Sequence, residues 1–189
     1  MLINLNQLLP ELENNENLKA GDCHQAILDV CYDHWNKDEN KGWSYVDMAN
    51  FARFRFGDLI QFLLLAGKYN QQITNGGHCQ YYENGYASGK DGYEPRRVDT
   101  NSLHHEMMTR FKELKLDQHP IGKEVFKIQE RFYRMMYDWT PPEDEGEPYF
   151  PKESDELDTK YFELNDEWME YLNSYAKEFV HNKTVGMRQ

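Results

Sequence analysis

The chain has 189 residues and a formal net charge of −12, from 33 acidic and 21 basic side chains. A surface this negative repels nucleic acid and anionic lipid, so direct DNA binding is not expected. The 13 Tyr, 10 Phe and 4 Trp supply large apolar surfaces that a disordered acidic chain lacks, which predicts a folded protein. The longest apolar run is far shorter than the roughly 20 residues of a membrane-spanning helix.

The cysteine content and the first residues of the chain bear on its compartment. Three cysteines are an odd number, and residues 1–10 show no basic region followed by an apolar stretch. Both features favour the reducing cytoplasm.

The first half of the chain predicts a series of helices. Residues 1–20 are expected to form an N-terminal arm or a short helix, ahead of a helical domain at residues 21–189. Apolar residues recur at helical spacing from His24 to Trp35, and a second helical region follows Ser44 and reaches Asn75, with a candidate break at Gly57-Asp58. We expect Gly76 to end this region as a left-handed cap.

The second half continues the helical pattern after a turn-rich stretch at residues 85–95. A helix is expected at residues 101–114, capped by Asp99 or Thr100, and another at residues 121–137. The last helix carries one apolar stripe that runs from Leu157 to Phe179. The predicted fold class is therefore all-α, a single compact helical domain of about six or seven helices with a long amphipathic C-terminal helix.

Most of the negative charge lies in one segment, because residues 138–171 hold 13 acidic and two basic residues, net −11. Its first part, residues 140–154, is a proline-broken connector that carries four carboxylates: Glu143, Asp144, Glu145 and Glu147. On the last helix, spacing places four glutamates on one ridge flanked by Asp166: Glu156, Glu163, Glu167 and Glu170.

This ridge spans roughly 21 Å, over which duplex DNA carries about 12 phosphate charges. One ridge is therefore too sparse to match DNA alone, and the connector, the acidic front of the chain or a second subunit would have to supply the rest. An acidic face that merely keeps a helix soluble is the alternative interpretation. This alternative is less convincing here, because like charges at these spacings oppose helix formation.

The residue patterns predict no catalytic, metal or cofactor site. His104, His105 and Glu106 are consecutive, so on a helix they point about 100° apart. Cys79 follows His78 directly, and adjacent residues do not set up a nucleophile and its base.

The stretch from Tyr69 to Gly85 contains Asn-Gly-Gly, then Gln-aromatic and a closing Asn, and it resembles the signature of the DNA-mimic protein family. Leu157 to Phe162, a Leu-Asp followed by paired aromatics, is similar to a later family motif. The resemblance covers roughly residues 58–179. It implies an all-helical homodimer whose surface carboxylates imitate DNA phosphates and occupy the DNA-binding face of a transcription factor, without catalysis.

The matching motif positions are Asn75, Gly76, Gly77, Gln80, Tyr81 and Asn84. We interpret them as architectural, a tight helix-to-helix turn whose amide side chains satisfy free backbone groups. His78 departs from the family, which commonly has an aromatic or other bulky apolar residue at this position.

Three hypotheses follow for function. The leading one is a DNA mimic that binds a basic DNA-binding protein through the ridge, Asp166 and the four connector carboxylates. The second is an immunity or antitoxin-like protein that neutralises a basic toxin or nuclease with the same face. The third is an enzyme or ligand-binding protein built around the turn at residues 76–84.

Overall fold

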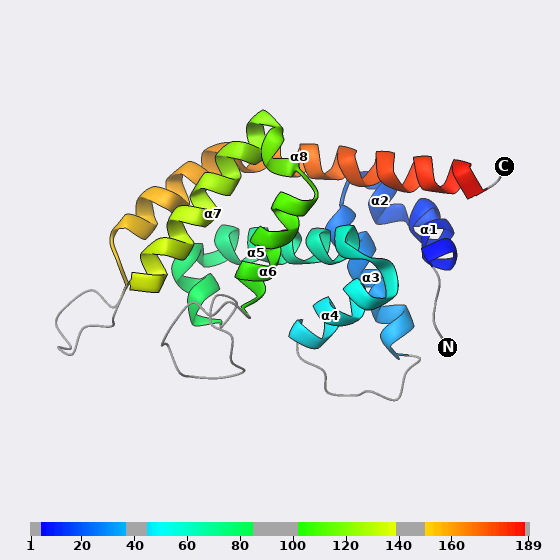
Figure 1. The fold of residues 1–189 in the computed structure, drawn as a ribbon, viewed down its shortest axis with the longest axis horizontal. Coiled ribbons are helices and arrows are strands. Elements are labelled where there is room, and N and C mark those ends of the chain that lie inside the picture. Colours follow the sequence, from blue (N-terminus) through cyan, green and yellow to red (C-terminus); the bar gives the residue numbers. More distant parts are fainter. Residues whose placement is uncertain (1–4, 37–44, 85–101, 139–149, 188–189) are drawn as a thin grey trace. The chain divides into compact units, whose positions relative to one another are not determined.

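The computed structural model describes residues 5–36, 45–84, 102–138 and 150–187, and all of its regular structure there is helical (Figure 1). The helices are α1 (Leu5–Asn14), α2 (Glu16–Ala20), α3 (Cys23–Asn36), α4 (Tyr45–Phe56), α5 (Asp58–Glu83), α6 (Leu103–Glu113), the 3-10 helix η1 (Leu116–Gln118), α7 (Pro120–Asp138) and α8 (Glu153–Met187). The predicted all-α fold with a long C-terminal helix is confirmed, with eight α-helices in the described ranges. None of these helices is apolar over a length sufficient to cross a bilayer.

The helices form two compact units. The first unit comprises residues 1–67 and 169–189, and the second comprises residues 68–168. Helices α5 and α8 contribute a segment to each unit.

In the first unit, α1 and α2 pack against α3, and Leu9, Leu12 and Leu18 are buried. Leu9 and Leu12 of α1 and Leu18 of α2 are therefore core residues of two short helices. Asn15 separates these helices, and its side chain accepts hydrogen bonds from two backbone N–H groups at the start of α2.

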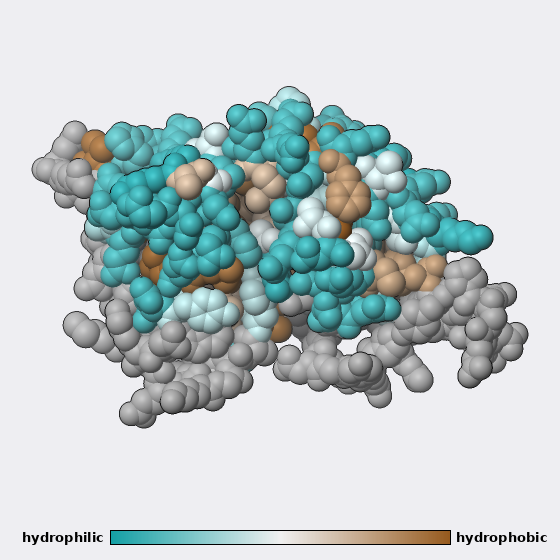
Figure 2. All heavy atoms as spheres, turned by 180° about the vertical axis from the view of Figure 1, so that it is seen from behind, coloured by the Kyte–Doolittle hydropathy of each residue, from teal (hydrophilic) through white to brown (hydrophobic). Residues whose placement is uncertain are grey.

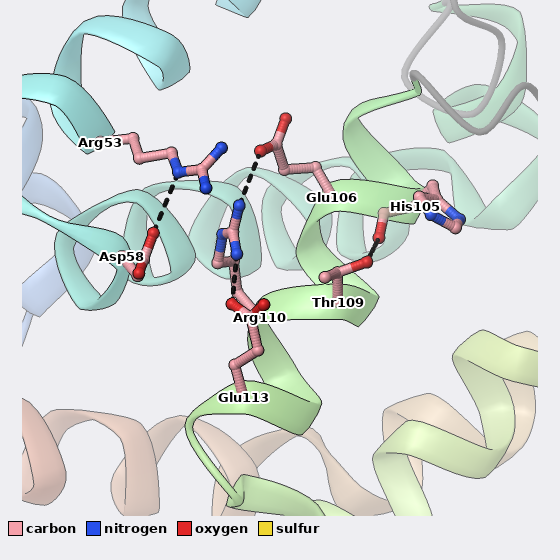
Figure 3. A network of polar contacts seen from close by, with 7 residues as sticks. All are labelled: Arg53, Asp58, His105, Glu106, Thr109, Arg110 and Glu113. Carbon is pink, nitrogen blue, oxygen red and sulfur yellow. Dashed lines mark hydrogen bonds and ion pairs between the residues drawn. The ribbon is translucent and has the colours of Figure 1, made fainter.

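The predicted break at Gly57-Asp58 lies between α4 and α5. Gly57 has a φ of +93°, a left-handed conformation that glycine adopts without steric cost. Arg53 of α4 and Asp58 at the start of α5 form an ion pair of 3.0 Å across this break (Figure 3).

In the second unit, α6, η1 and α7 pack together, and the start of α8 runs beside α7 (Figure 1). The side chain of Ser102 caps α6 by accepting the N–H of His105 at 3.1 Å, so the predicted cap at Asp99 or Thr100 is wrong. Asp99 and Thr100 themselves lie outside the described residues. On α7 the predicted apolar face is buried, including Val125 and Phe132.

A buried arginine ties the turns of α6 to one another. Only 7% of the Arg110 side chain is exposed, and it pairs with Glu106 at 3.2 Å and with Glu113, one turn to either side (Figure 3). Both pairs have helical spacing, so they support α6 locally.

Candidate functional site

Three carboxylates, Glu163, Asp166 and Glu167, are exposed together on the part of α8 that belongs to the second unit. Their spacing of three and four residues places them on one face of the helix. Among the described residues, none forms an ion pair with any of the three. We call these three residues the acidic patch.

The surface near the patch also carries an apolar side chain. Phe162, which immediately precedes the patch, is 48% exposed. Figure 2 shows that the described side chains on the visible face are mostly hydrophilic, with a few separate apolar ones between them. Aromatic residues are enriched at protein-binding surfaces relative to the rest of the surface.

The other carboxylates of the predicted ridge have different surroundings. Glu156 forms an ion pair of 3.3 Å with Arg131 of α7, and both side chains are about half exposed or more. An exposed pair of this kind contributes less than about 1 kcal/mol, but it offsets the charge of Glu156. Glu170 is exposed and belongs to the first unit. The connector carboxylates lie outside the described residues: Glu143, Asp144, Glu145 and Glu147.

An open groove of about 490 Å³ lies beside this ion pair. It is lined by three basic side chains of α7, which are Lys127, Arg131 and Arg134. The other lining residues are Glu130, Met135, Pro151 and Glu153. Each basic side chain already pairs with a glutamate, so the groove carries little net charge. The ion pair between Arg131 and Glu156 could not be derived from spacing along the chain, because the two residues are 25 positions apart on different helices.

The Gly-Gly motif divides α5 into two helical parts, and the first part ends at Asn75 as predicted. Gly76 and Gly77 leave the helical conformation, and the helix resumes at His78. The left-handed φ belongs to Gly77 (+71°) and not to Gly76 (−165°), so the predicted cap at Gly76 is wrong. A Cβ atom at residue 77 would also overlap the carboxylate of Asp158, which leaves room for glycine alone.

Asp158 of α8 caps the resumed part of α5. Its Oδ1 accepts the backbone N–H of His78 at 2.8 Å and also contacts Nδ1 of the same residue. On the other side of the imidazole ring, Nε2 lies 2.6 Å from the hydroxyl of Tyr69. The two motifs of the family resemblance, 80 residues apart, therefore meet here, and we call Tyr69, His78 and Asp158 the buried triad.

Aromatic rings enclose the buried triad. The Phe132 ring of α7 lies 4.7 Å from His78, and the Tyr81 ring packs edge-on against Tyr69 at 4.9 Å. His104 of α6 lies 5.9 Å from Tyr69, and its Nε2 is 3.1 Å from the carbonyl oxygen of Gln129. Burial lowers the pKa of His104 to about 3 and raises that of Tyr69 well above its usual value.

The amide side chains of the motif bond to one another. Gln80 Nε2 donates to Gln72 Oε1 at 3.2 Å, and Asn84 Nδ2 donates to the same oxygen. The interpretation that these amides satisfy free backbone groups is therefore wrong, because the Asp158 carboxylate does so instead. Asn75 is exposed and Tyr81 is buried.

The geometry of the turn favours an architectural role over chemistry. Tyr69 and His78 have no exposed surface, so neither can touch a substrate. Cys79 is half-buried, and burial together with Glu83 raises the pKa of its thiol to about 11, which disfavours the reactive thiolate. His78 was predicted only as a departure from the family, and its pairing with Asp158 could not be derived from spacing along the chain.

Comparisons of the chain with protein-family models, with curated proteins and with solved structures found no match.

Proposed function

We propose that this protein is a non-catalytic binding protein, a DNA mimic whose acidic patch occupies the basic face of a DNA-binding protein such as a transcription factor. The observation that carries the proposal is the exposure of Glu163, Asp166 and Glu167 on one helix face, without an ion pair to any described residue. The fold gains nothing from this arrangement, because like charges at helical spacing repel one another.

The patch suits a basic partner in two respects. Carboxylates with no ion pair to a described residue can accept charge-assisted hydrogen bonds from Arg or Lys without first losing another partner. The exposed Phe162 next to them offers apolar contact area at the centre of such an interface. Glu156, which already pairs with Arg131, is expected to contribute to the rate of association with a basic partner more than to affinity.

Three carboxylates do not reach the charge density of duplex DNA, so the proposal includes a homodimer that presents two patches. The net charge of −12 also makes the protein repel DNA itself, and it favours binding to the positively charged surfaces of DNA-binding proteins.

The test is competition between this protein and DNA. Proteins held on immobilised duplex DNA at low salt are eluted with this protein, and the eluted protein is then measured for direct binding. We expect elution by the wild type and loss of most of it with the triple variant Glu163→Gln, Asp166→Asn, Glu167→Gln. Three lost charged contacts of about 0.5–1 kcal/mol each would weaken binding roughly 10- to 100-fold.

The matched control removes three acidic charges elsewhere, from Glu16, Asp33 and Glu178, which are exposed residues of the first unit. It has the same net charge as the triple variant and should elute as well as the wild type. If the two variants behave alike, bulk charge explains the binding and the patch does not. If the eluted protein is a nuclease whose activity is blocked, the immunity hypothesis replaces the DNA mimic.

A further inference from the structure

The hydrogen atoms of the buried triad can be counted from its geometry. A carboxylate only accepts, so the His78 Nδ1 that contacts Asp158 must carry a hydrogen. In a neutral imidazole, Nε2 then has a free lone pair, and the Tyr69 hydroxyl 2.6 Å away donates to it. With the His78 backbone N–H, three hydrogens meet three acceptor positions, and none is left over.

A further proton disturbs this balance. If it binds Nε2, the Tyr69 oxygen must accept, and the hydrogen of that hydroxyl then needs another acceptor in a fully buried place. If it binds Oδ2 of Asp158, Oδ1 still accepts both N–H groups of His78, but the two hydrogen bonds lose their negative charge and weaken. An unpaired buried hydroxyl hydrogen in the first case, or two weaker hydrogen bonds in the second, destabilises the contact between α5 and α8.

The described groups that face the triad are mainly aromatic rings, and the buried Nδ1 of His104 has no hydrogen-bond partner among the described residues. From α5 the rings of Tyr69 and Tyr81 face it, from α6 His104, and from α7 Phe132. On α8, Tyr161 packs edge-on against Tyr69 and donates its own hydroxyl hydrogen to Asn70 at 3.1 Å. Two carboxylates, Glu83 and Asp155, lie near Cys79 and contribute to its raised pKa.

We propose that the buried triad is an acid-sensitive clamp, which holds α8 on the interrupted turn of α5 at neutral pH and releases it when it takes up one proton. The turn is suited to opening, since Gly76 and Gly77 already leave the helical conformation there. This inference concerns the second unit alone and does not depend on the function proposed above.

The titration of His78 agrees with the proposal. Burial lowers the pKa of His78, although the hydrogen bond and charge of Asp158 act in the opposite direction. The open state, in which His78 reaches water, therefore binds the proton more tightly than the closed state. The free energy of closing is fully present above the pKa of about 6.5 of a solvated histidine and falls as the pH drops below it.

The test is amide hydrogen exchange of the full-length protein by NMR at about pH 7 and pH 5, corrected for intrinsic exchange rates. The protection of the His78 amide is compared with that of amides in α3. If one proton is taken up on opening, the protection of the His78 amide should fall up to about 25-fold between pH 7 and pH 5. This factor is the change in proton binding of an open-state histidine with a pKa of about 6.5. In α3 it should stay nearly constant.

Two variants isolate the group. His78→Phe keeps an aromatic ring among Tyr69, Tyr81 and Phe132 and still offers its backbone N–H to Asp158. The protection of this amide should therefore fall less between pH 7 and pH 5 than in the wild type, because only His104 still contributes to the fall. His181→Gln removes an exposed histidine of the first unit and should behave like the wild type. Protection of the His78 amide that is unchanged at pH 5 in the wild type, or lost equally in His78→Phe, would overturn the proposal.

A second measurement needs no variant. The ¹⁵N shifts of the His78 ring in the wild type should show a neutral imidazole with its hydrogen on Nδ1 at pH 7. A hydrogen on Nε2, or a charged ring at that pH, would contradict the hydrogen count on which the clamp is built.

Discussion

The contact between Asp158 and the turn of α5 leads to a quantitative prediction for Asp158→Ala. The substitution removes the acceptor of the His78 backbone N–H at 2.8 Å and of its Nδ1. A hydrogen bond to a charged group contributes about 1.5–3 kcal/mol, which gives about 3–6 kcal/mol for two. Because 21% of the Asp158 side chain is exposed, water can replace part of this, and we expect a loss of about 3 kcal/mol.

The assay is urea denaturation followed by far-UV circular dichroism, with the free energy of unfolding taken from the midpoint and slope. Asp158→Asn keeps one acceptor oxygen and should lose roughly half as much. Asp166→Ala is the control on the same helix, where an exposed carboxylate should change stability by less than about 0.5 kcal/mol. An Asp158→Ala protein as stable as this control would refute the assignment of Asp158 as the cap of the resumed α5.

Three further predictions follow from the same contacts. Gly77→Ala should lose more stability in urea than Gly57→Ala, by at least about 1 kcal/mol, because both have positive φ but only residue 77 would overlap Asp158. Equal losses would contradict this. Acidification from about pH 7 to 4.5 should lower the free energy of unfolding by about 2–3 kcal/mol, because the pKa of His104 is about 3 in the folded protein and the unfolded chain therefore binds the proton at a higher pH. The loss in the His104→Phe variant should be smaller in the same titration. The free energy of unfolding of the triple variant should exceed that of the wild type by about 0.5 kcal/mol, because two repulsive pairs within the acidic patch disappear. A lower urea midpoint than that of the wild type would show that the carboxylates stabilise the fold.

Local patterns predicted most of the helices. The apolar spacing from Ile121 to Met136 corresponds to α7, and the stripe of α8 supplies the buried Leu157, Tyr161 and Trp168. The break at Gly57-Asp58 was also predicted, because a glycine beside an aspartate within a helical pattern is a local signal. These features depend on residues within a few turns of one another.

Errors arose where a distant residue decides the local structure. The helix does end before Gly76-Gly77 as predicted, but the cap of the next helical part at His78 is the Asp158 carboxylate, 80 residues later in the chain. The amides of Gln80 and Asn84 were expected to bond to the backbone, but with that role taken they bond to Gln72. In the same way, the charge of Glu156 is offset by Arg131, which belongs to another helix.

The two faces of α8 in the second unit are under different constraints. The inner face is fixed by contacts: Trp168 stacks on Phe111 at 5.2 Å, and Asp158 fits a turn that admits only glycine at residue 77. The outer face at Glu163, Asp166 and Glu167 forms no ion pair with the described residues, and its charges oppose the helix that carries them. Packing and helix propensity would accept neutral or mixed residues there equally well. The fold therefore does not explain the negative charge of this face, which is why we assign the binding surface to it rather than to the buried triad.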